Sequence, residues 1–491
     1  MPEQRNETAA RPDVAVPRSA WNVGLLDPLG QSSRGAELTS DAAWLQAMVD
    51  VELALTRTLI DVRLAPEWMN GVCDALTDAA SLDLAAIAAE GRGGGNPVIP
   101  LVKHLGAAAE AIRPGASDHI HVGATSQDIL DTATMLIASR VTGETRARLA
   151  VLAGELAGLA DAHRMTVMAG RTLGQQASPT SFGLLAAGWL DAVLAAAARI
   201  DNVRAALPVQ LGGAVGNLAV LTGIAAARRA DAAPNAVVHD LLVGFAARLG
   251  LVAPPLSWHT NRLVISELAS VLAGATGAVG AFALDVTVLA RTEIGEVGER
   301  LGKGEGGSSA MPHKRNPVTA VLVTAAARQT PGLAATLFSS LLAEDQRPSG
   351  AWHAEWQALR ELERLAVSAV TGAASLAERL VVDDDRMRAN LDITDGLIFS
   401  ERVTTILAEA LGKTVAFDLV TSASSESVST SRPLQVVLAG ALASEGASDD
   451  LRRQIWAAFD YSGDLGQTDA GIDRVLGKYR EFHARADTQE S

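Results

Sequence analysis

The sequence has little cysteine and few aromatic residues, and each shortage excludes a class of protein. Cys73 is the only cysteine among 491 residues, so the chain can form neither an internal disulfide nor a metal site built on several cysteines. Aromatic residues make up 4% of the sequence, which favours a core of small aliphatic side chains in closely packed helices. The cysteine usage indicates a reducing, cytoplasmic setting.

Basic residues are also in the minority: 41 Lys and Arg stand against 56 Asp and Glu, a formal net charge of −15. This balance argues against a nucleic-acid partner, which would require a clustered basic face. An anionic substrate would have to be held by local positive charge. Charged residues interrupt the apolar runs before the roughly 18 residues that span a bilayer, so no membrane segment is predicted. Residues 1–18 are polar, and we expect a disordered tail there.

The apolar residues recur at helical spacing, and no window alternates as a strand would. The pair Ser178-Pro179 is typical of a helix start, with a hydroxyl cap and a proline in the first turn. These patterns predict an all-α fold with a central bundle of long helices. We expect helices over about residues 40–62, 128–138, 144–163, 182–206, 266–291 and 318–342.

The long alanine-rich helices are apolar over much of their circumference, which predicts an obligate oligomer. The length of the chain allows more than one domain. We expect an N-terminal helical domain over residues 19–118, the bundle over 119–375 and a C-terminal helical domain over 376–491. The acidic run at 383–385 breaks the hydrophobic pattern near the second boundary.

Residues 304–317, GEGGSSAMPHKRNP, are the most distinctive segment of the chain. Glycines let a backbone approach a ligand closely and move. A serine accepts a proton only if its pKa is lowered, and Lys314 with Arg315 could lower it while holding an anion. The segment therefore suits the delivery of a hydroxyl to a small anion.

The segment has two other interpretations. Gly302, Gly304 and Gly307 fit the dinucleotide pattern G-x-G-x-x-G, but the preceding residues are charged and Pro312 interrupts any following helix, so this interpretation is poor. The second alternative is a solvated surface loop with a basic cluster, and the sequence of the segment alone does not exclude it.

Two further polar clusters interrupt the apolar pattern. In HVGATSQD (121–128), Thr125 and Ser126 precede a helix, where free N–H groups and the helix dipole favour a carboxylate. In GRTLGQQASPT (170–180), hydrogen-bond donors again gather ahead of an expected helix. The alternative for residues 121–128 is ordinary helix capping, and the alternative for residues 170–180 is a loop that joins two helices. Three such clusters suggest one shared site, and their spacing leaves open whether one subunit or several supply it.

The segment GSSAMPHKRNP resembles the signature loop of the aspartase/fumarase superfamily, G-S-S-x-M-P-x-K-x-N-P, and matches it at every fixed position. The other two clusters resemble the superfamily's first and second characteristic segments, so the resemblance covers roughly residues 35–400. The branch that looks closest is 3-carboxy-cis,cis-muconate cycloisomerase, through the segments GGNPVIPLVKHL (94–105), PVQLGGAVG (208–216) and RPSGAWHAEW (347–356). The resemblance implies a three-domain helical fold, a homotetramer with sites lined by three subunits, and no metal or organic cofactor.

The resemblance also implies a reaction and residue roles. A base removes a proton beside a carboxylate of a small polycarboxylate substrate, and a leaving group departs from the neighbouring carbon through an aci-carboxylate carbanion. Ser308 would be the base, with Ser309 and Lys314 as the other catalytic residues. Residues implied to contact the substrate are Thr125, Ser126, Gln127, Thr172, Gln175, Met311, Arg315, Asn316 and Arg347.

Leu173 departs from several members of the superfamily, which carry a histidine at this position. Leucine cannot protonate a leaving group, which disfavours water and ammonia and favours a stable anion. We therefore expect a cofactor-free lyase similar to the cycloisomerase, whose leaving group is the carboxylate of a lactone. A nitrosuccinate lyase that releases nitrite and fumarate is the close alternative. A catalytically silent binding protein is the third hypothesis, and the intact serine segment argues against it.

Overall fold

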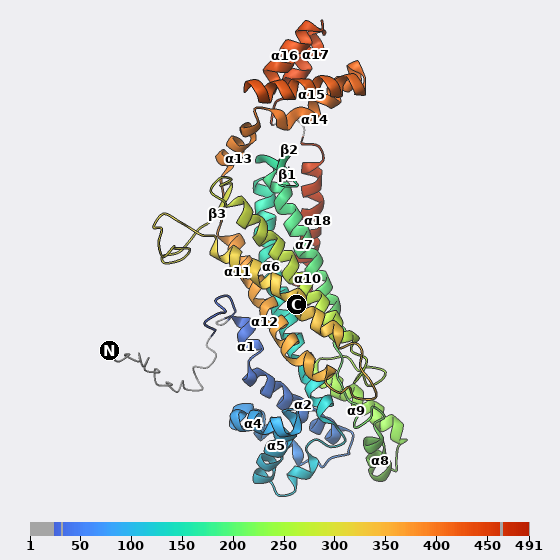
Figure 1. Ribbon diagram of the computed structural model, residues 1–491. Helices are drawn as coiled ribbons and strands as arrows, with labels where there is room; N and C mark the ends of the chain where they lie inside the picture. Colours follow the sequence, from blue (N-terminus) through green and yellow to red (C-terminus); the bar gives the residue numbers. More distant parts are fainter. Residues whose placement is uncertain (1–23, 31–32, 462–464, 491) are drawn as a thin grey trace, which may run out of the picture.

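The computed structural model describes residues 24–30, 33–461 and 465–490, so the tail predicted over residues 1–18 lies outside the described residues. The described chain is a long rod of helices (Figure 1). Long helices form its middle, the N-terminal helices lie at one end, and a group of shorter helices lies at the other. The predicted all-α fold is confirmed.

The central bundle consists of five long helices that pack along one another. Leu and Ala side chains fill the space between them, as the low aromatic content predicts. The sequence predicted two helices where the structure has one unbroken helix, α6, because residues 139–143 carry no helix breaker other than Gly143. The bundle helices are α6 (Ser126–Ala162), α7 (Phe182–Arg204), α10 (Leu263–Leu289), α11 (Val318–Ser339) and α12 (Ala351–Glu378).

Shorter helices surround the end of the bundle at which α6 begins. The side chain of Ser40 accepts a hydrogen bond from the N–H of Ala43 and caps α2, so the predicted helix over residues 40–62 is confirmed. The helices here are α1 (Arg34–Leu38), α2 (Asp41–Asp61), α3 (Met69–Ala75), α4 (Leu84–Gly94), α5 (Val98–Ile112), α8 (Ala219–Arg228) and α9 (Pro234–Leu249), with short 3₁₀ turns at Ala79–Ser81 and Ala116–His119.

A second hydrophobic cluster forms the opposite end of the rod. Its helices are α13 (Asp384–Leu391), α14 (Ser400–Leu411), α15 (Lys413–Thr430), α16 (Leu434–Ser444) and α17 (Asp449–Ala457), with 3₁₀ turns at Asp392–Thr394 and Leu397–Phe399. The last helix, α18 (Thr468–Glu490), leaves this cluster and returns along α7 (Figure 1). Arg164 fastens it there through Asp469 and Asp473, at 2.7 and 2.6 Å. The expected C-terminal domain thus includes a helix that packs on the bundle.

A small hairpin corrects two expectations about residues 167–181. Strands β1 (Val167–Thr172) and β2 (Gln175–Ser181) pair antiparallel, although the sequence predicted no strands. Helix α7 begins at Phe182 with Ser181 as its cap, so the helix start predicted at Ser178-Pro179 is wrong. Pro179 is tolerated opposite Ala169 because every strand of a two-stranded sheet is an edge strand. A second short pair joins β3 (Val297–Glu299) to β4 (Leu380–Val382).

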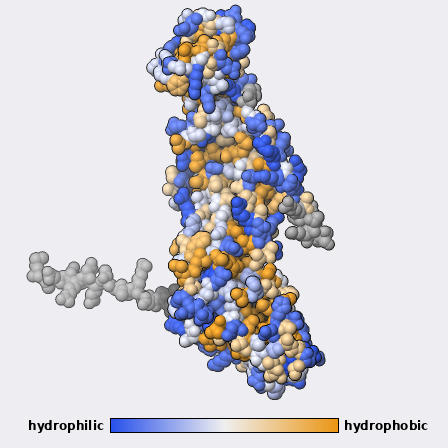
Figure 2. Space-filling view, turned by 90° about the vertical axis from the view of Figure 1, so that its right-hand side faces the viewer, coloured by the Kyte–Doolittle hydropathy of each residue, from blue (hydrophilic) through white to orange (hydrophobic). Residues whose placement is uncertain are grey.

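The bundle helices are only partly covered within one chain. By length and composition alone, α7 and α10 could cross a membrane, and 56% and 50% of their apolar windows are buried. Other apolar side chains are also exposed, among them Val321 and Phe338 on α11 and Leu342 in the loop that follows it. Hydrophobic surface gathers along the middle of the rod on the face that Figure 2 shows. This surface supports the prediction of an oligomer.

Glu363 on α12 is a buried acid without a partner. It has no exposed surface, and neither of its carboxyl oxygens has a hydrogen-bond partner in the described part of the chain. Burial disfavours the charged form and raises the pKa of Glu363 well above its usual value. Because the folded pKa exceeds the unfolded one, this group destabilises the fold increasingly as the pH rises from the unfolded towards the folded pKa.

The variant Glu363→Gln should therefore be more stable than the natural protein at neutral pH. We expect Tm at about pH 7.5 to rise by roughly 2–4 °C, because the variant has no buried acid to keep neutral. The difference should shrink as the pH is lowered towards the unfolded pKa. Glu155→Gln, at an exposed site on α6, is the matched control and should show no such trend in calorimetry. A lower Tm for Glu363→Gln at neutral pH would contradict this account.

Candidate active site

The start of α6 is fixed by a buried carboxylate. Asp128 has no exposed surface, and its Oδ2 accepts hydrogen bonds from the N–H groups of Thr125 at 3.0 Å and Gly213 at 2.9 Å. Its Oδ1 accepts from the N–H of Gly212 at 2.9 Å and lies 2.7 Å from Nε2 of His259. Ser126, the first residue of α6, remains partly exposed, as Thr125 does. Their hydroxyls therefore stand at a rigid helix N-terminus, which suits an anion.

Gln127 faces inward from this helix start and orients Arg347. Its Nε2 donates to Oδ2 of Asp131 at 3.1 Å and to the carbonyl of His259 at 2.9 Å. Its Oε1 accepts from Nε of Arg347 at 3.0 Å. Gln127 is fully buried, so within this chain its amide is used by protein contacts. The group of Thr125, Ser126 and Arg347 is called the anchor below.

A buried ion network that the sequence analysis missed supports the anchor. Arg262 is 2% exposed and lies between Asp131, at 2.7 Å, and Glu355, at 3.0 Å. The indole of Trp352 donates to Oδ1 of Asp131 at 2.9 Å. The sequence feature that could have revealed this network is the presence of two acidic residues, Asp131 and Glu355, within apolar stretches of α6 and α12. Removing one member of such a network would leave a buried charge without a partner.

His121 lies just ahead of the anchor and pairs with a buried glutamate. Its Nδ1 lies 2.6 Å from Oε1 of Glu52, which has no exposed surface. Burial lowers the pKa of His121, but the hydrogen bond and the charge of Glu52 outweigh it, so the net pKa is raised. The backbone of His121 is left-handed, with φ of 59°, a conformation that asparagine also tolerates.

The variant His121→Asn should lose a stabilisation that is pH-dependent. A folded pKa above the unfolded value means that the pair stabilises fully below about pH 6.5 and less as the pH rises through the folded pKa. We expect a loss of about 2 kcal/mol on the acid side, typical of a charged hydrogen bond. Unfolding in denaturant at several pH values measures it, and His239→Asn, at an exposed site on α9, is the control. A loss that grows with pH would contradict the pairing.

The hairpin presents its tip to solvent. Thr172, Leu173 and Gln175 are exposed, and Leu173 is exposed to 104% of its reference area. Leu173 and Gly174 both have positive φ, 51° and 81°, as a two-residue hairpin loop with a type I′ turn requires. Such a backbone conformation is costly for a leucine, and strained residues cluster at functional sites.

The base of the hairpin is joined to the segment that leads to the serine loop. Arg171 holds both carboxylate oxygens of the buried Glu296, at 2.9 and 2.6 Å. Nδ2 of Asn390 on α13 donates to the same carboxylate at 2.7 Å. Strand β3 begins at the next residue, Val297, and the loop follows it. The hairpin and the serine loop therefore share one support.

The serine loop, residues 300–317, projects from the side of the rod between β3 and α11 (Figure 1). The Oγ of Ser308 accepts hydrogen bonds from the N–H groups of Ala310 and Met311, at 3.3 and 3.1 Å. Both the N–H and the Nδ2 of Asn316 donate to the carbonyl of Gly306, at 2.9 and 3.1 Å. The other loop residues predicted for the site are exposed: Ser309, Met311, Lys314 and Arg315.

Gly306 lies where these hydrogen bonds close the loop. It has φ of 66°, and a Cβ atom there would collide with the side chain of Leu301 and lie 2.9 Å from the carbonyl oxygen of Asn316. Below this closure, Glu305 accepts from Arg379 at 2.8 Å and fixes the loop to the end of α12. The loop thus has a tied base and an exposed tip, which suits a segment that closes over a ligand.

Helix α6 separates the predicted site residues within one chain. The anchor lies at its N-terminus and the hairpin follows its C-terminus, and its 37 residues span about 55 Å at 1.5 Å per residue. The structure brings Thr125, Ser126, Gln127 and Arg347 together at one end of the bundle. It places Thr172, Gln175 and the serine loop towards the other end (Figure 1).

Comparison with known proteins agrees with these features. The model of a lyase family matches residues 36–332. The chain is 45% identical over 462 residues to nitrosuccinate lyase of Streptomyces davaonensis, covering 92% of this chain and 94% of that one. It is 38% identical over 455 residues to 3-carboxy-cis,cis-muconate cycloisomerase of Bradyrhizobium diazoefficiens, covering 92% and 97%.

Solved structures show the same fold. The crystal structure of 3-carboxy-cis,cis-muconate lactonizing enzyme from Pseudomonas putida superposes with a TM-score of 0.83 at 34% identity, covering 94% of this chain and all of that one. Fumarate lyase from Mesorhizobium sp. BNC1 superposes with a TM-score of 0.78 at 30% identity, covering 90% and 97%. The chain therefore belongs to the lyase family of the aspartase/fumarase superfamily and is an enzyme of the lyase and cycloisomerase type.

Proposed function

We propose that this enzyme removes an anionic leaving group from a small polycarboxylate at sites built by several subunits of a homotetramer. The observation that carries the shared site is the length of α6. An anchor and a hairpin about 55 Å apart cannot meet on one small substrate within a chain, and the ion pair of Arg171 with Glu296 ties the segment before the serine loop to the hairpin. A second chain packed on the exposed apolar face of the bundle would bring its serine loop to the anchor of the first. The family resemblance implies neither a metal nor an organic cofactor.

The proposed reaction begins with the substrate held at both ends. Thr125 and Ser126 of one subunit bind a carboxylate at the helix N-terminus, beside Arg347. The serine loop of another subunit closes, and Ser308, as the alkoxide that the positive charge of Lys314 favours, takes the proton from the carbon next to a carboxylate and becomes a neutral hydroxyl. Lys314 and Asn316 stabilise the aci-carboxylate that forms, and this electrostatic term should be the largest contribution to the rate. The electron pair then forms the double bond as the leaving group departs with its own pair.

Leu173 restricts the reaction to leaving groups that depart without being protonated. The hairpin tip carries a fully exposed leucine where a proton donor would be needed to expel water or ammonia. A carboxylate or nitrite departs as a stable anion and needs no such donor. Ring opening of a muconolactone, the reverse of the cycloisomerase reaction, fits this limit. The splitting of nitrosuccinate into fumarate and nitrite fits it equally, and the 45% identity to a nitrosuccinate lyase favours keeping it as a second candidate.

A product assay on both substrates, side by side, tests the proposal. The purified enzyme is given nitrosuccinate in one arm and 3-carboxy-cis,cis-muconate in the other, and nitrite, fumarate and lactone are measured. We expect nitrite and fumarate in equal amounts, or lactone formation, from one of the two. Malate and aspartate are the matched controls with poor leaving groups, and neither should yield fumarate. Fumarate from either control, or no turnover in any arm, would contradict the proposal, and the latter would favour a silent binding protein.

A further inference from the structure

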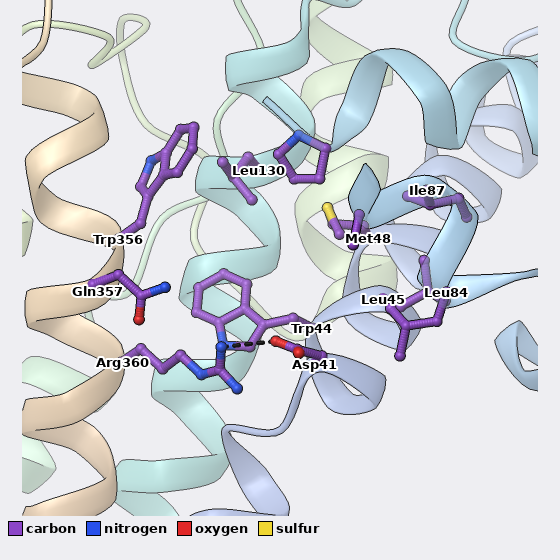
Figure 3. Close-up of a pocket in the computed structure, with 12 residues that line it drawn as sticks. Asp41, Trp44, Leu45, Met48, Leu84, Ile87, Leu130, Trp356, Gln357 and Arg360 are labelled. Atoms are coloured by element: carbon purple, nitrogen blue, oxygen red, sulfur yellow. Dashed lines mark hydrogen bonds and ion pairs between the residues drawn. The ribbon is translucent and has the colours of Figure 1, made fainter. Parts of the chain in front are cut away.

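A cavity lies between the N-terminal helices and the bundle, on the same chain as the anchor. It has a volume of about 190 Å³, is lined by residues of α2, α4, α6 and α12 and by Pro97, and opens to solvent. An engineered protein cavity of about 150 Å³ holds a benzene molecule, so this one has room for a single six-membered ring. Figure 3 shows the side chains of α12 on one side of it and those of α2 and α4 on the other.

The walls of the cavity favour an aromatic ring. Trp44 on α2 and Trp356 on α12 contribute the aromatic surface, and Leu84, Ile87 and Leu130 contribute aliphatic surface. Aromatic rings gain from offset or edge contacts with a second ring, beyond the area they bury. The indole Nε1 atoms of Trp44 and Trp356 are both buried and have no hydrogen-bond partner in the described part of the chain. Because both atoms are closed off from solvent, neither is offered to a ligand, and the two indoles present apolar ring surface to the cavity.

The mouth of the cavity is polar but electrically balanced. Arg360 lies there with its NH1 2.7 Å from the carboxylate of Asp41, and its Nε donates to the carbonyl of Thr39 at 2.7 Å. The charge of Arg360 is thus compensated, which removes the attraction for an anion. Gln357, exposed beside it, offers an amide that both donates and accepts hydrogen bonds.

We propose that this cavity binds an uncharged monocyclic phenol. The ring fills the space between Trp44, Trp356 and the aliphatic side chains. The hydroxyl lies at the mouth, where it donates its hydrogen to the amide oxygen of Gln357. Leu130 follows Ser126 by one turn of α6, so the ligand would contact a helix that carries the anchor. The inference does not depend on the reaction proposed above.

Binding of 4-fluorophenol to the full-length enzyme, followed by fluorine NMR, tests this site. We expect saturable binding with a Kd of about 1 mM or tighter, a range suited to a ligand of this size. Ala88→Trp, which fills the mouth from α4, should weaken binding at least about tenfold. The matched control is Ala89→Trp, at the next position of the same helix and outside the cavity lining, and it should leave binding unchanged.

Further probes separate the ring from the hydroxyl. Gln357→Leu should weaken 4-fluorophenol about fivefold and leave fluorobenzene unchanged, because one hydrogen bond is lost. 4-Fluorobenzoate should bind more weakly than 4-fluorophenol. The proposal is overturned if 4-fluorophenol does not saturate, if Ala88→Trp binds as well as the natural protein, or if the benzoate binds better. Binding that appears only after removal of residues 1–23 would show that this segment fills the cavity, and would also overturn it.

Discussion

Replacing Ser308 with alanine is expected to lower kcat by roughly 10²–10⁴-fold, the range typical of a general base. The fold should be preserved, because Ser308 lies on an exposed loop and its Oγ bonds only locally, to Ala310 and Met311. The substrate carboxylate would still bind to the anchor, so KM should change far less than kcat. Steady-state kinetics on the substrate that shows turnover, together with circular dichroism, makes this measurement.

Two variants keep the Ser308 result interpretable. Ser308→Thr retains a hydroxyl and should keep more activity than Ser308→Ala. Ser429→Ala removes an exposed hydroxyl from α15, far from the loop in sequence, and should be fully active. Turnover near the natural level in Ser308→Ala would exclude Ser308 as the base.

Two inactive variants mixed together should regain activity. Ser308→Ala lacks the base, and the double variant Thr125→Ala, Ser126→Ala lacks the anchor hydroxyls. If a site takes its anchor from one chain and its loop from another, random mixed tetramers contain some sites with both parts intact. A one-to-one mixture, unfolded and refolded together, should recover about a quarter of the natural activity, since each intact part is present with a chance of one half.

The control for this mixing experiment is a chain that carries all three substitutions. Mixed with Ser308→Ala, it supplies no serine base, so no activity should return. Mixed tetramers that form but stay inactive in the first experiment would show that one chain supplies both parts of each site. That result would contradict the argument from the length of α6.

The sequence predicted the helices well where hydrophobic periodicity and capping agreed. Ser40 caps α2 as expected, and the apolar stretches became α7, α10 and α11 within a few residues of the predicted bounds. The hairpin was missed because its strands are short and its polar strand, Gln175–Ser181, shows little alternation. Ser178-Pro179 satisfied the local rules for a helix start, but Ser181 capped the helix three residues later. Because residues 175–181 pair with β1 as a strand, α7 begins after Ser181 and not at Ser178.

The chemistry of the site was less accessible from the sequence. The local motifs gave the serine loop and the helix N-terminus at Thr125. Contacts between residues far apart in sequence could not be predicted from local motifs. Examples are the contact of Asp128 with His259 and those of Arg262 with Asp131 and Glu355. Gln127 was expected to bind substrate, yet its amide holds Arg347 instead within the chain. Only the packed helices show that the anchor and the hairpin lie at opposite ends of α6.

A crystal structure of the Ser308→Ala variant with its substrate bound would test the central claim most directly. The account predicts a substrate carboxylate on Thr125 and Ser126 of one subunit. It also predicts a closed serine loop from another subunit, with residue 308 beside the carbon that loses its proton. A closed loop with residue 308 turned away from the substrate, or a substrate held by the serine loop and the anchor of one and the same chain, would contradict it.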